Sequence, residues 1–191
     1  MTASLIARAF QRYTAIHFAV LGAVAAVAAA IFYVAWFVYD AALALLGPFG
    51  GVIVSYGLWY TGAILSATIL RRPLAAFLGE TLGAALEALV PTPGGLYNLV
   101  YGALQGMFAE AVYAAFGYKR FDLIVHALAG AASAIGTLIA NLVLFRTLVY
   151  EATTEEGLII FTAVAVGYAI SGALWGVIAG TIARAAGRLV P

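Results

Sequence analysis

Aromatic rings, side-chain amides and a carboxyl group recur toward one end of four long apolar segments of this chain. Aromatic rings can stack on a flat heteroaromatic molecule, and amides and a carboxylate can bond its ring nitrogens or amino group. A belt of aromatic residues at a lipid interface would explain the tyrosines, but it would leave the acid and the amides unpaired. The sequence therefore predicts a binding pocket. Its predicted residues are Tyr56, Trp59, Glu87, Tyr97, Asn98, Tyr101, Gln105 and Asn141.

Three further polar side chains, Glu80, Glu110 and His126, lie deeper in the same apolar segments. A carboxyl group within hydrocarbon is costly unless it finds a partner or a water-filled cavity. Counting about 1.5 Å per helical residue brings Glu80 and Glu110 to similar depth, with His126 within reach. We therefore expect an inner polar cluster of these three. Hydrogen bonding that fixes the helices is the favoured interpretation, and proton-coupled transport by this chain alone, through Glu80 and Glu110, is the alternative.

The residues that most enzymes and metal sites need are scarce in this chain. It has no cysteine and two histidines, and no Ser–His pair or cluster of metal-ligating residues has a suitable spacing. The net charge of +1 gives no indication of nucleic-acid binding. We expect no enzymatic activity, no metal, no cofactor and no nucleic-acid partner.

The elements that must position these side chains are long apolar helices. The chain has 191 residues and is 65% hydrophobic and 9% charged, which is too apolar for a soluble domain. Crossing about 30 Å of hydrocarbon takes roughly 20 helical residues. The sequence predicts an all-α integral protein of the cell membrane, with residues 1–191 forming one domain of six transmembrane helices. The predicted spans are residues 14–39, 51–70, 74–90, 96–117, 123–147 and 158–183. The first ends at Asp40, and residues 47–51 form the loop between the first two spans.

The basic residues are distributed unevenly between the two sides of these spans. Only Arg146, near Glu151, Glu155 and Glu156, falls on one side, and the other eight basic residues fall on the opposite side. Short loops rich in Lys and Arg stay in the cytoplasm, so both termini are expected there. The eight are Arg8, Arg12, Arg71, Arg72, Lys119, Arg120, Arg184 and Arg188.

Small residues form stripes on two of the predicted helices. A stripe in the last span contains Gly172, Gly176 and Gly180, and we expect it to pack against a neighbouring helix of the same chain. The stripe in the first span is suited equally to a neighbouring helix and to a partner protein. It consists of Ala19, Gly22, Ala23, Ala26 and Ala30.

Several short motifs in residues 50–121 resemble those of YkoE-type S components of energy-coupling-factor (ECF) transporters. The first is Tyr56-Gly57-Leu58-Trp59-Tyr60, and the second is Arg71-Arg72-Pro73. They are followed by Glu80, Glu87 and the stretch Leu104-Gln105-Gly106-Met107-Phe108-Ala109-Glu110. The combination is more specific than any one of these motifs.

This resemblance implies a small membrane subunit that binds its substrate and has no ATPase activity of its own. S components have six helices, cytoplasmic termini and a pocket near the outer face. They work with a transmembrane coupling subunit and cytoplasmic ATPase subunits, and they move substrate by toppling within the bilayer. The YkoE-like members are associated with thiamine or its hydroxymethylpyrimidine precursor. By the same resemblance, the small-residue stripe from Ala19 to Ala30 would contact the coupling subunit.

Overall fold

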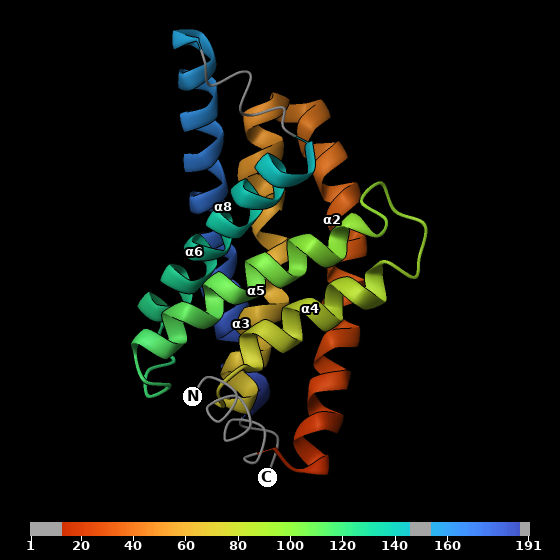
Figure 1. Ribbon diagram of the computed structural model, residues 1–191, viewed down its shortest axis with the longest axis vertical. Helices are drawn as coiled ribbons and strands as arrows, with labels where there is room; N and C mark the ends of the chain where they lie inside the picture. Colours follow the sequence, from red (N-terminus) through yellow and green to blue (C-terminus); the bar gives the residue numbers. More distant parts are fainter. Residues whose placement is uncertain (1–12, 146–153, 188–191) are drawn as a thin grey trace.

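The computed structural model describes residues 13–145 and 154–187, and all of the regular structure in these ranges is helical (Figure 1). This confirms the all-α prediction. Helices suit so apolar a chain because they satisfy the backbone polar groups without water. The elements are α2 (Ala15–Ser55), the 3₁₀-helix η1 (Tyr56–Tyr60), α3 (Thr61–Leu70), α4 (Ala75–Glu87), α5 (Tyr97–Ala115), α6 (Leu123–Phe145) and α8 (Glu155–Gly187).

The first helix is longer than its predicted span of residues 14–39. Helical backbone continues beyond Asp40 and is interrupted only at Gly47, which has φ 73° and ψ −176°. Glycine tolerates this positive φ, and Pro48 then begins the returning arm, in which Gly51 lies against Tyr39 and Leu43. The predicted loop of residues 47–51 is therefore a sharp reversal between two packed helical arms. The charge of Asp40 suggested an early end, but the backbone needs no break there.

The second predicted span, residues 51–70, is divided into three pieces. The end of α2 leads into η1 and then into the short helix α3. Gly57 lies at this break, where its N–H donates to Ser171 Oγ of α8 over 2.8 Å. A Cβ at Gly57 would overlap the Ser171 carbonyl group, so the close approach to α8 requires glycine.

Helices α6 and α8 pack backbone to backbone through their glycines. Gly172 faces Gly130, and Gly176 faces the backbone of His126. A Cβ at any of these glycines would overlap the opposite helix. The expected internal packing of the glycine stripe in the last span is therefore confirmed.

The small-residue stripe of the first span is on the outside of the bundle. Its five members, Ala19, Gly22, Ala23, Ala26 and Ala30, are all exposed. A Cβ built on Gly22 meets nothing within 4 Å. Residues between them, such as Leu21, Ala25 and Ala28, are buried and face the bundle. The stripe thus contributes little to packing within the described part of the chain.

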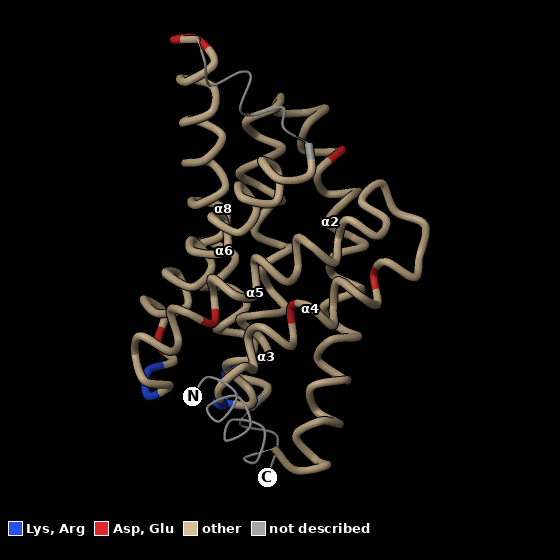
Figure 2. The backbone as a smooth tube through the Cα atoms, viewed as in Figure 1, with Lys and Arg blue, Asp and Glu red and all other residues tan. Residues whose placement is uncertain are grey.

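Three segments of the described chain are long and apolar enough to cross a membrane: Ala15–Leu70, Leu123–Leu144 and Glu155–Ala186. The shorter helix α4 has 13 residues, so the count of six spans is still a prediction. Figure 2 shows the Lys and Arg residues of the described part gathered at one end of the bundle. Arg8, Arg12, Arg146 and Arg188 lie outside the described residues, so the orientation of the chain stays a prediction.

Candidate ligand-binding site

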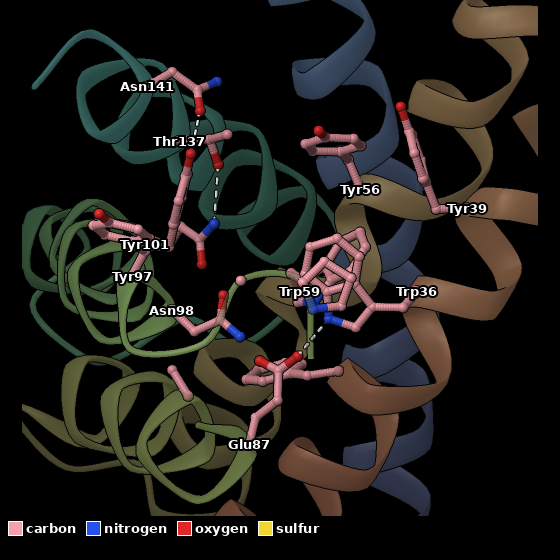
Figure 3. Close-up of a pocket in the computed structure, with 15 residues that line it drawn as sticks. Trp36, Tyr39, Tyr56, Trp59, Glu87, Tyr97, Asn98, Tyr101, Thr137 and Asn141 are labelled. Atoms are coloured by element: carbon pink, nitrogen blue, oxygen red, sulfur yellow. Dashed lines mark hydrogen bonds between the residues drawn. The ribbon is translucent and has the colours of Figure 1, made fainter. Parts of the chain in front are cut away.

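A cavity of about 410 Å³ opens among α2, η1, α4, α5 and α6 (Figure 3). Pockets for small organic ligands typically measure about 300–1,000 Å³. All eight residues of the predicted pocket line this cavity. Its lining residues are Phe32, Trp36, Tyr39, Tyr56, Trp59, Ala84, Glu87, Pro93, Gly94, Tyr97, Asn98, Tyr101, Gln105, Thr137 and Asn141.

Helix geometry explains why the predicted residues meet. In η1, Tyr56 and Trp59 are three residues apart, and a 3₁₀-helix has three residues per turn, so both side chains lie on one side. In α5, Tyr97, Tyr101 and Gln105 recur every four residues and therefore share a face.

The carboxyl group of Glu87 lies at the base of the cavity in Figure 3. Glu87 is only 2% exposed, and its Oε1 accepts a hydrogen bond of 2.8 Å from Trp36 Nε1. The side-chain amide of Asn98 points toward the same group (Figure 3). The only acid among the lining residues is thus held by polar groups of two neighbouring helices.

Aromatic rings form the side of the cavity contributed by α2 and η1. The rings of Trp36 and Trp59 pack edge to face with centroids 5.0 Å apart, and those of Tyr56 and Trp59 do so at 5.6 Å. Tyr39 contacts Tyr56 at 5.8 Å, and Tyr168 stacks behind Tyr56 at 4.3 Å. These contacts hold the rings in fixed orientations, so the wall is prepared before any ligand arrives.

Amide and hydroxyl groups form the opposite side. Gln105 Nε2 donates to Thr137 Oγ1 over 3.0 Å, and the hydroxyl groups of Thr137 and Tyr60 are 2.8 Å apart. The Tyr101 hydroxyl donates to Asn141 Oδ1. The amides of Gln105 and Asn141 are therefore each held by a neighbouring hydroxyl group, which restricts their orientation toward a ligand.

The loop between α4 and α5 closes the remaining edge. Thr92 Oγ1 accepts hydrogen bonds from the N–H of Gly95, at 3.3 Å, and from Asn98 Nδ2, at 3.4 Å. Gly94 packs directly against the Asn98 amide, and a Cβ there would overlap it. Thr92 and Gly94 of this loop thus help to set the position of Asn98, a cavity residue.

Seven lining residues were missed by the sequence prediction. Phe32, Trp36 and Tyr39 come from α2, Ala84 from α4, Pro93 and Gly94 from the loop before α5, and Thr137 from α6. The spacing of four and three residues between the α2 aromatics is that of one helical face, which is a usable signal. It is obscured because Tyr33 and Phe37 place further aromatic rings on the exposed face of the same helix.

The structure separates Glu80, Glu110 and His126, which were expected to form one inner cluster. Glu80 Oε2 accepts the Ala63 N–H over 2.6 Å, while His126 Nδ1 is 2.9 Å from the Tyr113 hydroxyl. The carboxyl group of Glu110 turns instead toward the corner between α3 and α4. The single cluster is therefore corrected to three separate sets of contacts.

Glu110 binds the free backbone N–H groups at the start of α4. One oxygen accepts from the Leu74 N–H at 2.6 Å, and the other accepts from Ala76 at 2.9 Å and Phe77 at 3.3 Å. The Tyr118 hydroxyl adds a bond of 2.6 Å, and burial together with this bond raises the pKa of Tyr118. The first N–H groups of a helix lack partners within it, and a carboxylate also suits the positive end of the helix dipole.

Glu80 makes one such bond to α3, because Ala63 lies in the first turn of that helix, and its Oε1 has no hydrogen-bond partner among the described residues. Both buried glutamates therefore act as caps supplied by another helix. These contacts favour the helix-fixing interpretation of Glu80 and Glu110 over proton-coupled transport.

Three comparisons show which known proteins this chain resembles. Residues 16–136 match the model of a family described as ABC-type cobalt transport system, permease component. The chain is 36% identical over 100 residues to YkoE of Bacillus subtilis (strain 168), whose name describes an HMP/thiamine permease. That match covers 51% of this chain and 50% of the relative, so the chain matches about half the length of this curated protein.

A solved structure extends the likeness to nearly the whole chain. The crystal structure of an S component of an ECF transporter matches with a TM-score of 0.76 and 26% sequence identity. It covers 93% of this chain and 85% of the solved chain. The resemblance to YkoE-type S components and the expected membrane localisation are confirmed by these matches and by the apolar helices.

Proposed function

The chain belongs to the family of ABC-type cobalt transport system permease components, and we propose that it captures a thiamine-like pyrimidine outside the cell for ATPase-coupled uptake. The observation that carries the proposal is the convergence of the eight predicted residues on one cavity of about 410 Å³. The fold match to an ECF S component and the similarity to an HMP/thiamine permease support it.

The chemistry of the cavity suits a flat heteroaromatic ring. Trp59, Tyr97 and Tyr101 offer surfaces on which the ring stacks. Glu87 accepts a hydrogen bond from an amino group or neutralises a cationic ring, which also gains from the aromatic faces. Asn98, Gln105 and Asn141 set the orientation through amide hydrogen bonds. The proposed ligand is therefore a neutral or cationic aminopyrimidine that lies between the aromatic side and the amide side of the cavity.

The lining residues favour an organic ligand over a bare metal ion. They include a single carboxyl group and no His or Cys side chain. Divalent cobalt is held in proteins mainly by imidazole, thiolate and carboxylate ligands. One carboxylate within an aromatic wall is a poor set of ligands for such an ion, whereas it suits an amino group.

The remaining parts of the proposal concern topology and partners. Six helices cross the membrane, both termini lie in the cytoplasm, and residues 1–191 form one domain that catalyses no reaction itself. Energy comes from cytoplasmic ATPase subunits through a transmembrane coupling subunit. The exposed stripe from Ala19 to Ala30 is the surface for that subunit, because small side chains allow another helix to approach closely.

Ligand binding to the purified protein tests the proposal. Trp36 and Trp59 line the cavity with ring centroids 5.0 Å apart, so an occupying ring should quench their fluorescence. We expect a saturable response to thiamine, to hydroxymethylpyrimidine or to both, and none to a cobalt salt. A response to cobalt alone, or to neither pyrimidine, would contradict the vitamin assignment.

A further inference from the structure

The hydrogen bond between Trp36 and Glu87 joins two walls of the cavity. The indole N–H of Trp36 on α2 donates to Glu87 Oε1 on α4 over 2.8 Å. Both residues line the cavity, and Figure 3 shows the carboxyl group directly below the indole ring. Glu87 is 2% exposed, so protein groups determine the direction of its carboxyl group and water contributes little.

Trp36 is itself held in one place. Its ring meets Trp59 at 5.0 Å with an interplanar angle of 69°. One helical turn earlier, Phe32 is 1% exposed and packs on Gly62 of α3 and Gly83 of α4, where even a Cβ would crowd its ring. This part of α2 is therefore fixed against α3 and α4, and the indole N–H has a defined direction.

We propose that Trp36 is a positioning residue for ligand recognition: its N–H holds the Glu87 carboxyl group in the orientation that meets the ligand. Asn98 points toward the same group from α5 (Figure 3), so the group is set between two helices. Without the indole donor, the carboxyl group keeps its hydrogen bonds from Trp59 and Asn98 but loses one of the donors that fix its direction. The ligand then has to restore that direction on binding. This role rests on the proposed function, because it requires a ligand that contacts Glu87.

The decisive change removes the N–H and keeps the ring. Replacement of Trp36 by 3-benzothienylalanine leaves a bicyclic aromatic side chain with sulfur in place of the N–H group. We expect the affinity for the pyrimidine, measured by titration calorimetry, to fall about tenfold, the usual effect of losing a hydrogen bond to a charged group. The matched control is the same replacement at Trp175, whose N–H donates to the Val54 carbonyl over 2.7 Å. Trp175 does not line the cavity, and its replacement should leave the affinity unchanged.

A second measurement tests whether the replacement of Trp36 weakens ligand binding by changing the Glu87 carboxyl group. The infrared band of the Glu87 carboxyl group is identified as the band lost in the E87Q protein. In the ligand-free protein, the replacement at Trp36 should shift this band, because a hydrogen bond to the carboxyl group is gone. Weaker binding together with a shifted band supports the positioning role.

Two results would overturn the positioning role alone. One is unchanged affinity in the Trp36 isostere, and the other is weaker binding with an unshifted Glu87 band, which would mean that Trp36 donates to the ligand directly. A wild-type protein that binds neither thiamine nor hydroxymethylpyrimidine would overturn the proposed function, and the positioning role with it.

Discussion

Replacing Glu110 by glutamine should destabilise the protein strongly, although the two side chains have nearly the same shape. Glu110 is 8% exposed and accepts four hydrogen bonds, two at each oxygen. In E110Q an NH₂ group takes the place of one oxygen and faces donors that it cannot accept from. Two buried donors then lose their partner, and each costs about 1–3 kcal/mol. The loss of about 2–6 kcal/mol corresponds to a fall of roughly 4–24 °C in the melting temperature.

Far-ultraviolet circular dichroism of the protein in detergent, followed during heating, measures this fall. The matched control is E155Q, the same chemical change at an exposed position in the first turn of α8, where surface substitutions usually cost under about 0.5 kcal/mol. If E110Q and E155Q melt at the same temperature, Glu110 is not an essential cap of α4, and its assignment to the start of that helix is wrong.

Three further changes test the cavity and the outer surface. E87Q should weaken pyrimidine binding about tenfold or more, because it removes the negative charge within the aromatic wall; titration calorimetry measures it, and an unchanged affinity would exclude Glu87 from the site. Gly94→Ala should weaken binding with little change in melting temperature, since the added methyl group overlaps Asn98; equal affinity would show that the loop adjusts freely. Gly22→Leu should leave folding and ligand binding intact, because the surroundings of Gly22 are open. It should nevertheless reduce co-purification of the coupling subunit. Gly172→Leu, by contrast, should unfold the protein, because Gly172 packs on the backbone of Gly130. Normal assembly of the Gly22 variant would exclude the α2 stripe as the partner surface.

Most of the cavity could be predicted from the types and depths of polar residues. Asn98, Gln105 and Asn141 are costly on a lipid-facing surface, so their presence at one level already indicated a shared interior. The contribution of α2 could not be predicted with the same ease. Its aromatic residues occur on several faces, and Phe32 turns inward through packing on Gly62 and Gly83, which the sequence alone does not show.

Two other features could not be predicted, for a different reason. They are the positions at which the helices end and the groups to which the buried glutamates bind. The chain reverses within the predicted loop of residues 47–51, but the helical backbone on both sides of Gly47 depends on contacts between the two arms, which the composition does not show. Depth along a helix brought Glu80 and Glu110 to one level. Their carboxyl groups point apart because each satisfies the N–H groups of a different helix, and this is a property of the assembled bundle.

The two capping glutamates share a direction along the chain. Glu80 lies on α4 and caps the preceding helix α3, and Glu110 lies on α5 and caps the preceding helix α4. During synthesis from the N-terminus, each of these helices is therefore made before the residue that completes its first turn. The first N–H groups of α3 and α4 lack these partners until the next helix has been made and has packed beside them. Burying these groups in lipid is therefore costly until α4 has followed α3 and α5 has followed α4.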